Sequence, residues 1–331
     1  MAFRHEPMTN SNSIRLFTLY SGKFDDELAG AVGAGTFPSP GCPSYYFLSY
    51  AWKDASEAGA SLPLARSCRD WDRRDNSRTI KINEQPFRIC HNLALALLHI
   101  RSPTQPQCFW IDAICINFED DDERSSQYCL MPAIVARAEA VVAWLGPDDP
   151  EQFQELDSDE DKWVRMKINW DRGKIKFLPN ILCKLTGANL ESTPRRFIRT
   201  VSLVRNGYWN RLWTLHELCN AKRVFFVSGK NVWREEDIDS CKNSFGTFPI
   251  TRTLNARRDR HKKFSLEALL LKYHSYESDK QLDLVYALVG LSSDIWATPP
   301  NHIQNGNSSK SENGASLSHL TIDYKNTPYE A

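Results

Sequence analysis

The apolar residues of this chain fall into short runs that alternate with polar loops and helical stripes. One run ends at Asp112, an acidic loop follows at 117–122, and a second run extends from Ala140 to Gly146 after a helical stretch. Two short buried strands joined by a helical crossover form a parallel pair, because parallel neighbours need such a connection. Ligands of such sheets bind beyond the carboxyl ends of the strands, so the pattern places Asp112 and its loop beside a candidate site.

Three other regions have strand patterns. The aromatic run from Tyr45 to Trp52 is typical of a buried strand. Residues 79–89 and 223–233 alternate on either side of turn residues, which predicts two hairpins. Residues 1–43 give weak signals, and residues 53–78 are typical of a long polar loop.

Helical stripes predict four helices outside the crossover, at 92–100, 208–220, 266–271 and 282–291. Asn92 can cap the first of these, and Gly290 is placed to end the last. In the crossover helix, Asp121 or Asp122 can cap the first turn, and Pro132 predicts a kink or a restart near Met131. The mixed basic and apolar residues 162–204 also favour helix.

These elements predict an α/β fold with a mostly parallel central sheet wrapped by helices, added hairpins and a helical C-terminal extension. The expected organisation is an N-terminal segment (1–43), an α/β core (44–240), a helical extension packed on it (241–300), a flexible linker (301–316) and a terminal strand (317–331).

Composition narrows the functional classes. The 331 residues carry 41 basic and 41 acidic side chains, so net charge gives no reason to expect nucleic acid as a partner. Nine cysteines without a CxxC pair are typical of reduced thiols, not of a zinc ribbon or disulfide framework. No apolar stretch approaches the ~20 residues that span a bilayer, and MAFRHEPMTN lacks a signal-peptide core, so we expect a cytoplasmic protein.

Several catalytic motifs are absent from the sequence. Without a GxGxxG or GxxxxGK[ST] phosphate loop, ATP- or GTP-driven action is not expected. Cys115, His91 and His216 have no nucleophile elbow beside them, so a nucleophilic triad is not supported. The acidic run 119–123 matches no EF-hand spacing and is more typical of a solvated helix start than of a metal site.

Five phrases in order carry a family resemblance. They are FLSYAW (47–52), WIDAICINFEDDDERSSQ (110–127), VVAWLG (141–146), RLWTLHEL (211–218) and DLVYALVGL (283–291). Together they resemble the fungal heterokaryon incompatibility (HET) domain over 45–291. The sequence departs from the family pattern at Lys53, Phe118 and His216, which leaves a polar network around the last two in question. The resemblance implies a role in non-self recognition that ends in programmed cell death.

A more distant resemblance bears on chemistry. FLSYAW is similar to the first-strand phrase of Toll/interleukin-1 receptor (TIR) domains, and residues 213–218 are similar to their WCxxEL phrase. The TIR fold is a flavodoxin-like parallel sheet, which agrees with the strand and crossover signals. In TIR domains that cleave NAD, the glutamate of this phrase is catalytic, and Glu217 takes its place here, with Trp213 as partner. The resemblance also implies that Ser49, Tyr50 and Trp52 line the nucleotide pocket.

Glu217 and Asp112 each admit a structural interpretation. On a helical wheel, Glu217 shares a face with Trp209, Trp213 and Asn220, which suits an acid meeting a ribose beside stacking rings. The alternative is a surface glutamate paired with Arg211 or Arg223. Asp112 either orients a ligand, as part of the cofactor-binding set, or caps a turn and pairs with Arg124.

The other candidate residues also admit a structural interpretation, as buried parts of the protein interior. Ser49 and Tyr50 can be a buried strand-end hydroxyl and a core aromatic, and Glu123, Arg124 and Gln127 are typical of an internal polar clamp.

Three hypotheses about function follow, and they leave open whether the protein is an enzyme. The first is a death-inducing effector that hydrolyses NAD with Glu217, with NAD as substrate and no resident cofactor or metal. The second is a non-enzymatic module that acts through homo-oligomerisation or an incompatibility partner. A regulatory copy without activity is a third, suggested by the departures from the family pattern.

Overall fold

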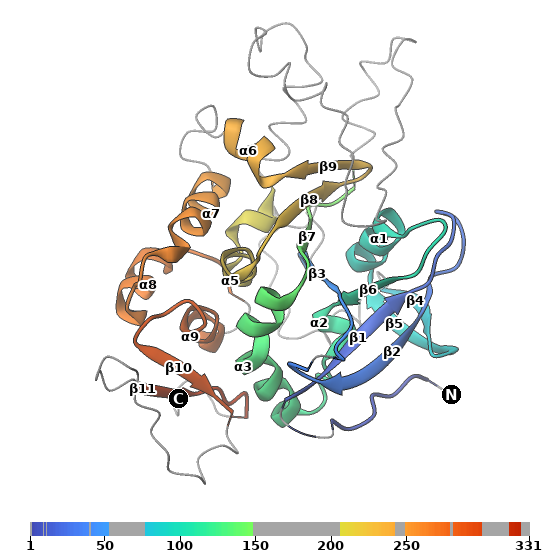
Figure 1. Ribbon diagram of the computed structural model, residues 1–331, viewed down its shortest axis with the longest axis horizontal. Helices are drawn as coiled ribbons and strands as arrows, with labels where there is room; N and C mark the ends of the chain where they lie inside the picture. Colours follow the sequence, from blue (N-terminus) through green and yellow to red (C-terminus); the bar gives the residue numbers. More distant parts are fainter. Residues whose placement is uncertain are drawn as a thin grey trace, which may run out of the picture.

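A nine-stranded sheet forms the centre of the protein, in the order β5-β4-β2-β1-β6-β3-β7-β8-β9 (Figure 1). The computed structural model describes residues 2–8, 10, 12–39, 41–52, 77–147, 206–241, 249–278, 281–299 and 318–325. The strands of this sheet are β1 (Ser13–Leu19), β2 (Ala29–Thr36), β3 (Tyr46–Tyr50), β4 (Ser77–Ile82), β5 (Gln85–Cys90), β6 (Gln107–Trp110), β7 (Val141–Trp144), β8 (Val224–Ser228) and β9 (Asn231–Arg234).

The middle of the sheet is parallel and its flanks are mixed. Strands β6, β3, β7 and β8 run parallel, whereas β1 is antiparallel to both β2 and β6, and the hairpins β4–β5 and β8–β9 are antiparallel. The α/β class is therefore confirmed, but the sheet as a whole is mixed, not mostly parallel. In chain order the four parallel strands lie 2-1-3-4, the flavodoxin-like order, and its switch point falls between β3 and β7.

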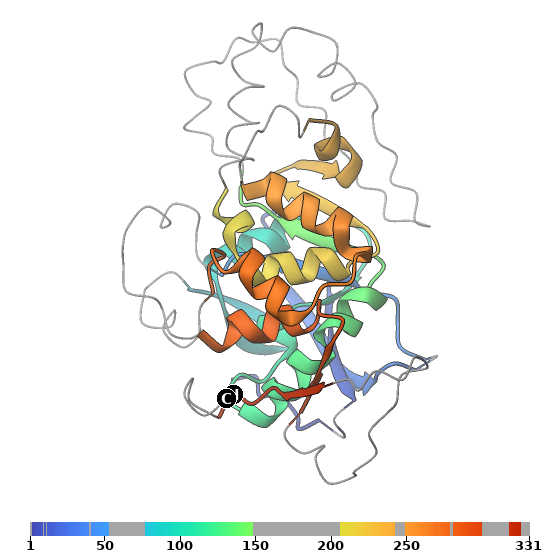
Figure 2. The ribbon, with the colours of Figure 1, turned by 90° about the vertical axis from the view of Figure 1, so that its left-hand side faces the viewer.

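Helices cover both faces of the parallel strands. Figure 1 shows α1 (His91–Ile100) on one side, with α3 (Asp121–Arg137) and α5 (Leu212–Asn220) on the other. Outside α5 lie α7 (Pro249–Arg258), α8 (Leu266–Tyr273) and α9 (Gln281–Val289) (Figure 2). The shorter elements are α2 (Asp112–Cys115), η6 (Gly207–Asn210), α6 (Glu235–Cys241) and η8 (Asp259–His261). In the described ranges no helix is both long and apolar enough to cross a membrane.

The apolar runs form two packed layers. Trp110, Trp144 and Trp209 are among the largest fully buried side chains, and the core of the sheet surrounds them. A second apolar cluster joins α5 to the outer helices through residues such as Leu215, Leu269 and Leu288. Six cysteines of the described ranges are free thiols, as expected: Cys42, Cys90, Cys108, Cys115, Cys129 and Cys219.

The last described residues pack across α3. Strand β11 (Ser318–Thr321) pairs with β10 (Ile295–Thr298) in a separate two-stranded sheet, so the expected strand near the end of the chain is present but outside the central sheet. Tyr324 follows it, is buried, and donates a hydrogen bond to Asp283 at 2.7 Å. The Arg124 guanidinium lies 3.7 Å from the centre of its ring, a cation–π contact.

The expected cap of α3 is wrong. Asp120 caps the helix, since its carboxylate accepts from the backbone N–H groups of Asp122 and Glu123. The helix continues through Pro132, so the expected restart is not found, and the alternative of a kink stays a prediction. One lost hydrogen bond is offset here by burial, because Met131, Ile134 and Val135 pack into the core around the proline.

Contacts distant in sequence shape a segment that gave weak signals and overturn two other expectations. Residues 1–43 contain two strands, β1 and β2, although β2 is rich in glycine and alanine. Asn92 does not cap α1 but is buried in its first turn. The predicted helix 208–220 is divided at Arg211, where the backbones of Asn210 and Leu212 bond to Glu277 instead. The predictions for 162–204 and 301–316 lie outside the described residues, as does most of the predicted loop 53–78.

Gly290 follows the end of α9, as expected. The reason for a glycine at this position is close packing against neighbouring side chains, not the turn of the backbone. A Cβ built there would lie 2.5 Å from Nε2 of His216 and 2.7 Å from Cγ of Pro132. His216 is buried, and burial lowers its pKa to about 3, so the ring stays neutral.

We expect Gly290→Ala to lower the free energy of unfolding by about 1 to 3 kcal/mol, because α9, α5 and α3 must separate to admit the methyl group. Urea denaturation measures the change. Gly33→Ala is the matched control, since its Cβ would meet nothing within 4 Å and should change stability by less than about 0.5 kcal/mol. Equal midpoints for the two variants would contradict this account of Gly290.

Candidate functional site

The candidate site lies at the carboxyl ends of β3 and β7, where the strand order reverses. Ser49 and Tyr50 are the last residues of β3 and pair with Ala143 and Trp144 of β7. Both side chains are buried, at 1% and 4% exposure. They therefore form the floor of this edge of the sheet, and the residues that reach it from other elements complete the site.

Glu217 reaches this floor from α5. Its Oε2 accepts a short hydrogen bond from the Ser49 hydroxyl, which also bonds to the Tyr208 hydroxyl at 2.7 Å. Burial raises the pKa of Glu217 to about 8, the charge of Asp112 adds to the rise, and Ser49 and Arg211 oppose it. The carboxyl group is therefore poised to change protonation near neutral pH, as catalytic acids and bases are.

Asp112 occupies the end of β6, at the first turn of α2. Its Oδ1 accepts from the Ala113 backbone N–H at 2.7 Å, and its Oδ2 accepts from the Trp52 indole at 2.9 Å. Burial raises its pKa. Asp112 in turn raises the pKa of Tyr50, after burial itself, so the two side chains lie close together. The expected pairing with Arg124 is not found, because that guanidinium lies over Tyr324 and bonds to Asp121.

The positive charge of Arg211 acts on the carboxyl groups of both Glu217 and Asp112. Arg211 lies at the break between η6 and α5, and its Nη1 donates to the Tyr50 carbonyl. Its charge lowers the pKa of Glu217 and of Asp112. Arg223, the other arginine considered for Glu217, pairs with Glu139 at 3.5 Å.

Asn92 holds the floor from the opposite face of the sheet. Its amide donates to the Ala51 carbonyl at 2.6 Å and accepts from the Trp144 indole at 2.8 Å. Arg211 and Asn92 therefore bond to consecutive carbonyl groups, that of Tyr50 at the end of β3 and that of Ala51 just after it, one from the α5 side and one from α1. This fixes the edge between the first and third parallel strands.

The structure brings five of the six candidate residues together, and Trp213 lies elsewhere. Ser49, Tyr50, Trp52, Asp112 and Glu217 are linked by the bonds and charges above. Trp213 packs instead on Tyr128 of α3, with ring centroids 4.8 Å apart, and on His216. Trp209, grouped with Glu217 on the helical wheel, is carried by η6 and packs on Phe226, because the break at Arg211 ends the wheel.

The acidic run 119–123 forms the start of α3, and its last residue, Glu123, belongs to an internal polar clamp that fixes α3 to β1. Glu123 is buried against Arg15 of β1, and Gln127 donates to the Ser13 carbonyl at 2.7 Å, as the clamp interpretation predicts. Among the described residues, no group of three or more His, Cys, Asp or Glu side chains is arranged to hold a metal ion.

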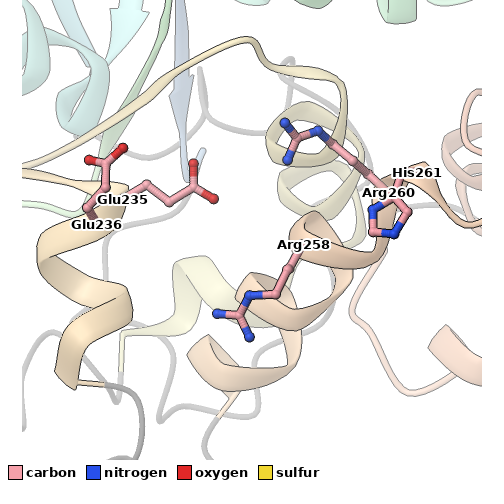
Figure 3. Close-up of a pocket in the computed structure, with 5 residues that line it drawn as sticks. All are labelled: Glu235, Glu236, Arg258, Arg260 and His261. Atoms are coloured by element: carbon pink, nitrogen blue, oxygen red, sulfur yellow. The ribbon is translucent and has the colours of Figure 1, made fainter.

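A separate hollow lies between α6 and the end of α7. It has a volume of about 430 Å³ and is lined by Glu235, Glu236, Arg258, Arg260 and His261 (Figure 3). Its acidic and basic side chains face each other across open space, and Glu235 also binds the buried Arg257 at 2.8 Å. It contains none of the candidate residues of the β3–β7 edge.

Three residues of the site were missed in the sequence. The sequence pattern gives Tyr208 no role at the site, predicts only an ion pair for Arg211, and predicts a helix cap for Asn92. Arg211 stands in the RLWTLHEL phrase, six residues before Glu217, so the phrase itself was the available signal.

The comparisons with known proteins agree with the sequence phrases. Residues 45–217, just over half of the chain, match the family model described as heterokaryon incompatibility protein (HET). The Heterokaryon incompatibility protein 6, OR allele, of Neurospora crassa is 28% identical over 250 residues, covering 67% of this chain and 34% of that protein. The chain thus spans about a third of the length of this curated relative. No solved structure matches the chain. The family match over most of the α/β core shows that the chain belongs to the heterokaryon incompatibility (HET) family.

Proposed function

We propose that this protein is an effector of non-self recognition that hydrolyses NAD at Glu217 and so triggers cell death. One observation carries the proposal. The Glu217 carboxyl group, with a pKa of about 8, lies near Asp112 at the switch point of a flavodoxin-like strand order. Ligands of such sheets bind at this point. The resemblance of residues 213–218 to the TIR phrase and the name of the Neurospora relative supply the biological context.

The reaction is hydrolysis of an N-glycosidic bond. The bond between ribose C1′ and the nicotinamide nitrogen breaks, and nicotinamide leaves with the electron pair. Water adds to C1′ and releases a proton, giving ADP-ribose. The intermediate stage is oxocarbenium-like, so a fixed carboxylate beside C1′ stabilises it electrostatically.

Each residue of the site has a defined task in this reaction. Glu217 faces the ribose and acts in its ionised form, the minor form at pH 7. Ser49 donates to its carboxyl group and is itself held by Tyr208. Asp112 and Trp52 support the rim at the end of β6. The NAD substrate carries its own reacting group, so the chemistry needs no bound cofactor.

Glu217→Gln is expected to lower the rate of NAD hydrolysis by at least about 100-fold, since the amide cannot carry the negative charge. The measurement is NAD consumption by purified protein, with NAD content and viability followed in expressing cells. Glu236→Gln is the matched control, an exposed glutamate outside the site, and should behave as wild type. If Glu217→Gln folds, kills cells as wild type does and NAD never falls, the enzymatic proposal is overturned.

That outcome would favour the second candidate, a module that acts by assembly. Large apolar side chains are exposed on the helical extension, with Leu271 of α8 at 71% and Trp296 of β10 at 59% exposure. Such side chains suit contact with a second copy of the chain or with an incompatibility partner.

A further inference from the structure

The Arg211 guanidinium has more hydrogen-bond donors than its contacts in the structure use. One of its N–H groups donates to the Tyr50 carbonyl, and among the described residues the remaining N–H groups of the guanidinium have no acceptor. A guanidinium presents five donors in a rigid fork, and this geometry matches a phosphate or carboxylate group in two parallel bonds. The residue is half-buried.

Of the two carboxyl groups whose pKa Arg211 affects, Glu217 offsets little of the positive charge at neutral pH. Glu217 and Asp112 are close enough for Arg211 to shift the pKa of each, yet burial raises both pKa values. With a pKa of about 8, most Glu217 side chains are protonated at pH 7 and do not offset the positive charge. An anion is therefore the natural ligand for this position.

The chain geometry also aims Arg211 at the edge of the sheet. Helix 208–220 is broken at this residue, whose backbone is extended (φ −79°, ψ 134°) and fixed to the outer helices through Glu277. Backbone breaks that local sequence does not demand are frequent at functional sites. The break carries the guanidinium to the last residue of β3, at the switch point.

We propose that Arg211 is the anion-binding residue of this site and selects substrates that bear phosphate groups, such as a pyrophosphate-linked dinucleotide. This inference rests on the proposed function and adds to it the residue that recognises the phosphate groups of the substrate. Glu217 meets the ribose, and Arg211 takes the phosphate oxygens in a forked pair of hydrogen bonds. A nucleoside with the same glycosidic bond but no phosphate is a poor substrate.

The test compares NAD with nicotinamide riboside, which has the same scissile bond and no phosphate. Arg211→Gln keeps a donor for the Tyr50 carbonyl and is expected to raise the KM for NAD about 10- to 100-fold, with a change below about threefold for the riboside. Any effect through the ionisation of Glu217 acts on both substrates alike, so parallel changes would overturn the proposal. An unchanged KM for NAD would overturn it as well.

Controls separate this proposal from the proposed function. Arg223→Gln removes an arginine outside the site and should match wild type for both substrates. If wild type hydrolyses neither substrate, the proposed function fails, and calorimetric titration with ADP-ribose then decides on Arg211. Binding that weakens at least about tenfold in Arg211→Gln supports the anion site, and absent or equal binding overturns it. If thermal melting shows that the glutamine variant does not fold, Arg211→Lys replaces it, with an expected intermediate KM because lysine lacks the fork.

Discussion

Wild-type protein is expected to lose stability relative to Glu217→Gln as the pH rises from 5 to 8. Glu217 has its pKa raised from an ordinary 4.5 to about 8 in the folded state, mainly by burial. Between these values the unfolded chain has released its proton while the folded protein keeps it, so the folded state loses ground as pH increases. Each pH unit costs about 1.4 kcal/mol, and since the residue is partly exposed we expect a total on the order of 3 kcal/mol.

The measurement is urea denaturation of both proteins at pH 5, 6.5 and 8. The glutamine amide can still accept from Ser49 but does not titrate, so the two curves should agree near pH 5 and separate above it. Other groups cancel in the difference between the two proteins. A constant difference across this range would mean that Glu217 ionises as freely in the folded state as in the unfolded chain.

This stability cost bears on the choice between an acid that serves the fold and one that serves a reaction. A carboxyl group that only supported the fold would be stabilised in its ionised form by cations or donors. Glu217 has one hydroxyl donor and the charge of Arg211 to favour its ionised form, and burial outweighs both. Retaining such a group is characteristic of sites where function opposes stability.

The elements with strong local patterns were predictable from the sequence. The strand at Tyr46–Tyr50, both hairpins and the crossover between β6 and β7 follow from apolar runs and turn residues. Strand β2 was not predictable in the same way, because AGAVGAGT has few large side chains and is held by its pairing with β1. Antiparallel flanks likewise depend on partners distant in the chain.

The sequence predicts most of the residues of the site, but not the contacts between them. Glu217 and Asp112 came from sequence phrases and strand ends, yet the bond between Ser49 and Glu217 spans 168 residues. The break at Arg211 depends on backbone bonds to Glu277, and no helical wheel contains that information. For the same reason Trp213 was expected beside Glu217, whereas it packs on α3.

The acidic phrase that identifies the family most clearly serves the fold. Glu123 and Arg15 form a buried bidentate pair, with N···O distances of 2.6 and 2.9 Å. The Asn117 backbone N–H also bonds to Glu123 at 2.6 Å, and Arg15 donates to the Cys115 carbonyl at 3.0 Å. The pair thus joins β1 and α3 to the end of α2 and the loop after it. Asp112 is the first residue of α2.

Glu123→Ala is therefore expected to destabilise the protein by about 3 to 5 kcal/mol, because it leaves the Arg15 charge buried without its partner. Replacing both residues, as Arg15→Met with Glu123→Leu, should recover much of this loss, since no charge remains to be desolvated. Lys81→Ala is the control: its pair with Glu27 is about half exposed, and its removal should cost less than about 1 kcal/mol. Denaturant unfolding distinguishes these cases, and a Glu123→Ala loss no larger than that of Lys81→Ala would show that the buried pair does not hold this joint together.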